Sequence, residues 1–224
     1  MKQLIAVCMP VFLLSACVIH VGHSAAAEDL KHQKRQLQLN AAGLTELKAE
    51  TEAGDLKIMG VQGLSQIELT ADLYASEDRP FTLSLEKQGS AAVLKAVGGP
   101  CVGICTGSSA YADLVVRVPA ELALTLEEGS GDIDIQGLNA DLMIEDGSGN
   151  LTVQGGRHLV LEDGSGNVSL TQLSGNLKVE DGSGDLFIRQ VAGTVQVEDG
   201  SGDIDIQQVT GMVSCLLYTS DAAD

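Results

Sequence analysis

The residues with the greatest capacity for chemistry are acids that occur in pairs. Four Glu-Asp pairs each precede a Gly-Ser-Gly triplet: Glu145-Asp146, Glu162-Asp163, Glu180-Asp181 and Glu198-Asp199. Paired carboxyl groups are suited to general acid–base catalysis. Catalytic carboxyls, however, need unlike environments that separate their pKa values, whereas here every copy has the same neighbours. The repetition therefore argues against an active site, and we expect no catalytic residues.

The same carboxylates could bind a cation. Calcium prefers oxygen ligands, and an ion would relieve the repulsion between carboxylates stacked about 4.8 Å apart. The candidate ligands are Asp146, Asp163, Asp181, Asp199, Asp185 and Asp203. The double-glycine spacing of calcium-binding nonapeptide repeats is missing, so the simpler interpretation is a solvated acidic edge whose aspartates close turns. Calcium binding is kept as the alternative, and no other cofactor is expected.

Cysteine offers one further candidate site. Cys101 and Cys105 lie four positions apart and could close a small disulfide loop in an oxidising compartment. A zinc site would need more ligands nearby, and His158 is the only histidine after His32. The turn serines have no paired histidine, so a hydrolytic triad has no support.

A repeat must position the acidic pairs. Gly-Ser-Gly begins at Gly129, Gly147, Gly164, Gly182 and Gly200, at intervals of 18, 17, 18 and 18 residues. Between the triplets, apolar residues alternate with polar ones in two short stretches, which predicts two strands per repeat and no helix. Two such strands cannot bury both of their faces, so successive coils must stack. The sequence therefore predicts an all-β fold, a β-solenoid of about 18-residue coils.

The inward-facing side chains follow from the alternation. They are Ile133, Ile135, Leu142, Ile144, Leu151, Val153, Leu159, Leu161, Val168, Leu170, Leu177, Val179, Leu186, Ile188, Val195, Val197, Ile204 and Ile206, with Leu138, Leu173, Val191 and Val209 at corners. The one shorter repeat lacks the corner residue, so we expect its deletion to leave both strands in register.

The N-terminal segment resembles an export signal. An apolar run from Leu4 to Leu14 follows Lys2 and is too short to span a bilayer. The run ends in Leu14-Ser15-Ala16-Cys17, which resembles the lipobox of bacterial lipoproteins, so Cys17 is the candidate lipidation site. Ala25-Ala26-Ala27 offers an alternative cleavage site that would release a soluble periplasmic protein.

The chain divides into five segments. Residues 215–224 resemble a translated sequencing-library adapter, so we give them no functional weight. The earlier half shows a degenerate copy of the repeat and a hairpin insertion, and we expect it to cap the solenoid. The predicted segments are a lipoprotein-type signal peptide over 1–16 (or a cleaved signal over 1–27), a linker over 17–35, degenerate coils and an irregular β cap over 36–126, the regular solenoid over 127–214 and the adapter artefact over 215–224.

Composition excludes one class of partner. The formal net charge is −18, which repels nucleic acid phosphates and favours cations or basic partners. Aromatic residues make up only 3% of the chain, as expected for a narrow interior filled by branched aliphatic side chains.

The stretch VPAELALTLEEGSGDIDI and the later copies of VEDGSGDLFI are similar to the bacterial “putative adhesin” β-solenoid family, a domain of unknown function. The resemblance covers residues 44–213 and implies a right-handed β-solenoid on exported or membrane-tethered proteins. It assigns no active site, because a fold does not specify a function.

Together these features predict a structural or binding module of the cell envelope and not an enzyme. We expect an outer-membrane lipoprotein, facing periplasm or surface, or a soluble periplasmic protein. The expected partners are the membrane, through the lipid anchor, and an envelope protein or polysaccharide. A calcium-stabilised acidic spacer is the alternative, and an enzyme would require a deep pocket with unrepeated polar residues.

Overall fold

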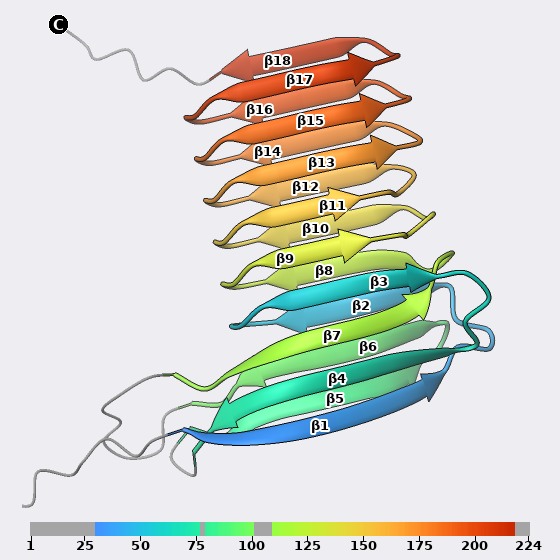
Figure 1. Cartoon of the computed structure of the whole chain (residues 1–224), viewed down its shortest axis with the longest axis vertical. Coiled ribbons are helices and arrows are strands. Elements are labelled where there is room, and N and C mark those ends of the chain that lie inside the picture. Colours follow the sequence, from blue (N-terminus) through green and yellow to red (C-terminus); the bar gives the residue numbers. More distant parts are fainter. Residues whose placement is uncertain (1–29, 77–78, 101–108, 218–224) are drawn as a thin grey trace, which may run out of the picture.

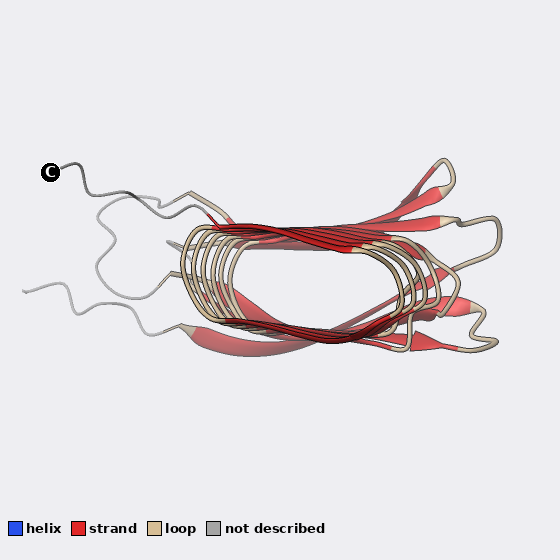
Figure 2. Ribbon diagram, turned by 90° about the horizontal axis from the view of Figure 1, so that it is seen from above, coloured by secondary structure: helices blue, strands red, loops and turns tan. Residues whose placement is uncertain are grey.

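The structure, a computed structural model, describes residues 30–76, 79–100 and 109–217. Short strands stack along one long axis (Figure 1), and the view along that axis shows the coils as flattened rings in which strands alternate with turns (Figure 2). This confirms the predicted all-β solenoid. Nowhere in the described ranges does a helix form that is long and apolar enough to cross a membrane.

Two sheets face each other across the interior. Their strands are β1 (Lys31–Asn40), β2 (Glu46–Thr51), β3 (Leu56–Val61), β4 (Gln66–Ala75), β5 (Phe81–Gln88), β6 (Ala91–Gly98), β7 (Tyr111–Pro119), β8 (Ala123–Glu128), β9 (Ile133–Gln136), β10 (Leu142–Asp146), β11 (Leu151–Gln154), β12 (Leu159–Asp163), β13 (Val168–Leu173), β14 (Leu177–Asp181), β15 (Leu186–Val191), β16 (Val195–Asp199), β17 (Ile204–Val209) and β18 (Val213–Leu217). Sheet A runs β1-β4-β7-β3-β9-β11-β13-β15-β17, and sheet B runs β18-β16-β14-β12-β10-β8-β2-β6-β5.

The regular coils pair in parallel, with like residues over like. Leu151 lies opposite Ile133 on one side and Val168 on the other. The coil with the deletion keeps this register in sheet B, where Leu159 pairs with Leu142 and Leu177. The missing residue is therefore absorbed at the corner, as predicted.

The core is a set of aliphatic ladders. From β9 to β16, every residue predicted to face inward is at most 3% exposed. Ile204 and Ile206, in the last described coil, are only partly buried. Burying each such side chain contributes about 1.5–3 kcal/mol, which offsets the entropy lost when the coil becomes ordered.

The part of the cap next to the regular solenoid is a coil with the same arrangement of strands as the repeat. Its two strands, β2 and β3, pair in parallel with β8 and β9, the strands of the first regular coil. Strands β5 and β6 form the expected antiparallel hairpin, and β1, β4 and β7 extend sheet A with antiparallel pairing. The spatial order differs from the chain order, because β2 lies between β6 and β8.

Candidate binding groove

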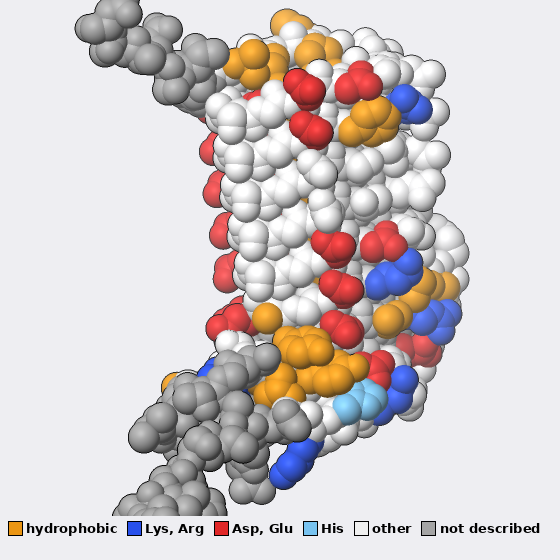
Figure 3. Space-filling model, turned by 60° about the vertical axis from the view of Figure 1, so that its left-hand side comes forward, with side chains coloured by type: hydrophobic (Ala, Val, Ile, Leu, Met, Phe, Trp, Pro, Cys, Tyr) orange, Lys and Arg blue, Asp and Glu red, His pale blue; other side chains and the backbone are white. Residues whose placement is uncertain are grey.

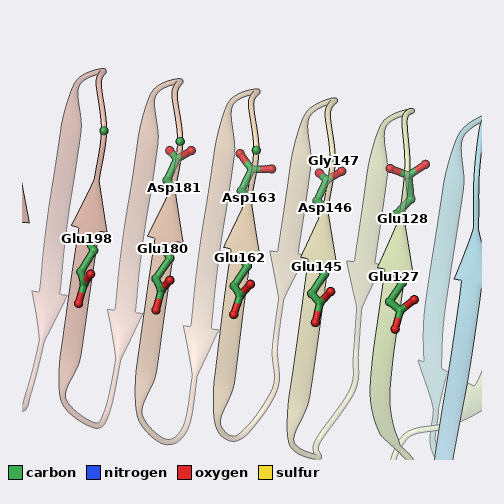
Figure 4. Close-up of a pocket in the computed structure, with 13 residues that line it drawn as sticks. Glu127, Glu128, Glu145, Asp146, Gly147, Glu162, Asp163, Glu180, Asp181 and Glu198 are labelled. Atoms are coloured by element: carbon green, nitrogen blue, oxygen red, sulfur yellow. The ribbon is translucent and has the colours of Figure 1, made fainter. Parts of the chain in front are cut away.

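A groove of 830 Å³ runs across the coils at the edge where sheet B meets the Gly-Ser-Gly turns. Each of β8, β10, β12 and β14 contributes two adjacent acidic residues to its lining. Figure 4 shows these side chains as two files that cross the strands. We call Glu127, Glu145, Glu162, Glu180 and Glu198 the outer column, and Glu128, Asp146, Asp163, Asp181 and Asp199 the inner column.

Strand alternation separates the two columns. Within β10, Ile144 points inward, Glu145 outward and Asp146 inward again. Parallel register then places each acid beside its counterpart in the next coil, as Glu145 lies beside Glu127 and Glu162. One dipeptide per coil therefore produces two columns in different environments.

The outer column faces solvent. Its glutamates are exposed or partly exposed, and acidic side chains follow one edge of the molecule from coil to coil (Figure 3). Lys178 forms an ion pair with Glu180 from within the same strand. The column therefore presents a negatively charged surface at a regular spacing.

The inner column is buried. Its members are only 2–6% exposed. Some of their carboxylate oxygens accept hydrogen bonds from backbone amides of the turns: Ser130 N–H donates to Glu128 Oε1 at 2.9 Å, and Ser183 N–H donates to Asp181 Oδ1 at 3.0 Å. The expectation of a solvated acidic edge is thus correct for the outer-column glutamates and wrong for the aspartates of the inner column, because the closed turn shields every second acid.

Comparison with known proteins adds the family. The family model of the Toastrack DUF4097 domain matches residues 70–217. The chain belongs to this family. No curated protein matches it.

Solved structures resemble this Toastrack chain only distantly. A crystal structure described as a putative cell adhesion protein from Clostridium sporogenes has 11% identity and a TM-score of 0.39, and it covers 84% of this chain and 100% of that one. A putative adhesin from Bacteroides fragilis has 15% identity and a TM-score of 0.41, with 84% and 97% coverage.

Burial changes the acidity of the inner column of the Toastrack chain. Desolvation, together with the neighbouring Asp146 carboxyl, raises the pKa of Glu128 to about 8. Desolvation and the carboxyls of Asp146 and Asp181 raise the pKa of Asp163 to about 8. The pKa values of Asp146 and Asp181 are also raised, with desolvation as the largest cause.

The Toastrack turns require glycine. At Gly166 the φ angle is 144°, and an added Cβ would lie 1.6 Å from the carbonyl oxygen of Gly149 in the preceding coil. The same close approach recurs at Gly184, where that distance is 1.7 Å. The backbone atoms of successive turns therefore leave no room for a side chain at these positions.

The other predicted ligands lie in a separate row. Asp185 and Asp203 precede strands of sheet A and do not line the groove. Asp203 N–H donates a hydrogen bond to Asp185 Oδ1 at 3.2 Å. In the preceding pair of coils, Asp185 N–H donates an equivalent hydrogen bond to Asn167 Oδ1. These side chains therefore link successive coils through the backbone.

Several predicted sites remain without a structural test. Cys17, Cys101 and Cys105 lie outside the described residues. Among the residues whose positions are described, no three or more His, Cys, Asp or Glu side chains are grouped so as to hold a metal ion. Calcium binding by the Toastrack chain stays a prediction.

Sequence reasoning missed one feature of the cap. Tyr74 stacks between His32 and Tyr111, with ring centroids 4.8 and 4.5 Å apart. These rings come from neighbouring strands of sheet A, at paired positions. Only the antiparallel pairing of distant segments reveals the stack, and no spacing in the sequence signals it.

Proposed function

We propose that the chain is a non-catalytic binding module of the bacterial cell envelope, and that its acidic groove binds a basic segment of another envelope component. The outer column carries this proposal. Its carboxylates recur about every 4.8 Å. A flexible segment rich in lysine or arginine can pair its positive charges with this row of carboxylates in more than one arrangement.

Absence of catalysis is part of the proposal. Two adjacent acids line the groove on each of four successive coils, so the arrangement repeats along the solenoid and no single position stands out as an active site would. A repeated surface suits a ligand that is itself extended.

The binding test uses oligolysine as the probe. We expect the triple variant E145Q/E162Q/E180Q to bind oligolysine on the order of tenfold more weakly than the unmodified chain, because each exposed charge contact contributes about 0.2–1 kcal/mol. Calorimetry at low salt measures the affinity, and added salt should weaken the binding further.

A charge-matched control decides whether the groove matters. Glu86, Glu121 and Asp205 are exposed and lie outside the groove lining. The variant E86Q/E121Q/D205N removes the same number of charges and should retain most of the affinity. Equal losses in the two variants would show a general effect of net charge and reject the groove as the binding surface.

The envelope location rests on the N-terminal sequence. Cys17 follows a lipobox-like tetrapeptide, and the alternative signal ends at Ala27. We expect Cys17→Ser to move the protein from the membrane fraction to the soluble fraction, because the acyl chains supply most of the membrane affinity. Immunoblotting of the fractions measures this change, and an unchanged membrane fraction would reject lipid anchoring at this residue.

A further inference from the structure

The inner column is an unusual use of acidic residues. Parallel register places Glu128, Asp146, Asp163, Asp181 and Asp199 in adjacent coils, about 4.8 Å apart along the stack. Strand pairing sets Asp146 directly beside Glu128 and Asp163, and Asp163 directly beside Asp181. The carboxyls therefore form one continuous buried file.

Most of the oxygens in this file have no other partner. Both carboxyl oxygens of Asp146 and of Asp163 are buried without any hydrogen bond from a protein donor, and so is one oxygen each of Glu128, Asp181 and Asp199. Buried polar oxygens without donors are rare in folded proteins, since the loss of hydration is not compensated. A proton on one carboxyl of each touching pair would supply the missing donor.

No base neutralises the file. In the described ranges, no lysine, arginine or histidine forms an ion pair with an inner-column carboxylate. Lys178 and Lys95 pair with Glu180 and Glu50 instead. Among the described residues, the charged groups that line the groove beside the column are the outer glutamates, and Asp132 adds a further negative charge near Asp146.

We propose that the inner column from Glu128 to Asp181 is a shared-proton file, in which protonated and ionised carboxyls alternate from coil to coil at neutral pH, so that the solenoid is a pH-sensitive stack. Asp163 is the central proton carrier. It lies between the carboxyls of Asp146 and Asp181, and neither of its oxygens accepts a hydrogen bond from a turn amide, whereas Glu128 and Asp181 each accept one. Loss of the shared protons would leave adjacent buried carboxylates that repel each other and would loosen the contacts between coils.

The direction of the pH effect follows from linkage. The pKa values of Glu128 and Asp163 are raised from 4.5 and 3.8 in the unfolded chain to about 8 in the folded one. A group with a raised folded-state pKa contributes stability that is complete below the unfolded value and is lost as pH rises through the folded value. Stability should therefore fall between about pH 4 and pH 8.

The test measures melting temperature at pH 5 and pH 9 by circular dichroism, with EDTA present to exclude cations. We expect the melting temperature of the unmodified chain to fall by about 5–10 °C over this range. Asp163→Asn keeps the shape of the side chain and removes the need for a proton. The melting temperature of this variant should therefore fall by about half as much as that of the unmodified chain, because the variant is more stable than the unmodified chain at pH 9.

Glu162→Gln is the matched control, because it removes one charge from the adjacent position of the same strand while leaving the inner column intact. It should shift the melting temperature equally at both pH values. The proposal would be overturned if the melting temperature of the unmodified chain stayed constant or rose from pH 5 to pH 9. It would also be overturned if Asp163→Asn and Glu162→Gln reduced the decrease in melting temperature equally.

A second measurement does not depend on the variants folding. Unfolding the unmodified chain with urea at pH 7 in weak buffer should release about one proton or more per molecule, since the folded chain holds protons that the unfolded chain cannot. Release of no proton would equally overturn the shared-proton file. The oligolysine experiment concerns the outer column, so its result does not affect this test.

Discussion

Gly166→Ala is expected to destabilise the protein by more than about 4 kcal/mol, an exceptional loss for one methyl group. The added Cβ would lie 1.6 Å from the Gly149 carbonyl oxygen, and the φ angle of 144° is one that alanine rarely adopts. Because the contact is with backbone, neither coil can yield without breaking its hydrogen bonds. Urea unfolding followed by circular dichroism measures the change.

Gly63→Ala is the control for this prediction. Gly63 also has a positive φ, 72°, but nothing lies within 4 Å of an added Cβ. Gly63→Ala should lower the free energy of unfolding by only about 1–2 kcal/mol, which is the cost of placing alanine in a left-handed backbone conformation. If the two variants lost equal stability, the close approach of the turns would not be the reason for glycine at Gly166.

Leu161→Ala is expected to lose about 2–5 kcal/mol, because it removes a fully buried side chain from the middle of an aliphatic ladder. Leu161 is 0% exposed and is paired with Ile144 and Val179 in the adjacent coils. The resulting cavity has walls on both sides, and the rigid coil spacing prevents it from closing. Denaturant titration gives the free energy of unfolding.

Val160→Ala provides the comparison, since Val160 precedes Leu161 on β12 and points outward. Its loss should be about 0.5 kcal/mol, typical of a surface position. Similar losses at both positions would contradict the assignment of faces on this strand. The same assignment separates the two acidic columns, so this pair of variants tests the basis of the groove as well.

The fold of the regular half could be predicted from the sequence because its information is local. Alternation with period two marks Ile133 and Ile135 as inward, and the even spacing of the Gly-Ser-Gly triplets places Leu151 and Val168 over Ile133. A single shift of one residue would expose every apolar side chain of a strand. The hydrophobic effect therefore allows only one register.

The buried aspartates show where this reasoning was incomplete. The alternation that places Ile144 inward also places Asp146 inward, two residues later. Because ionised carboxylates favour water, a solvated edge was the expected environment. The stacked turns exclude water from this position, and their shape depends on contacts between coils that are distant in sequence.

The sequence alone determined the strands of the regular half, the coil length, the identity of its core and the repeated Glu-Asp pairs, since each depends on residues near one another in the chain. Only the tertiary structure decided that β2 and β3 lie between β6–β7 and the first regular coil, that three rings stack in the cap, and that the paired acids divide into two columns. These features depend on which strand edges meet after the chain has folded, and many pairings are compatible with the same local pattern.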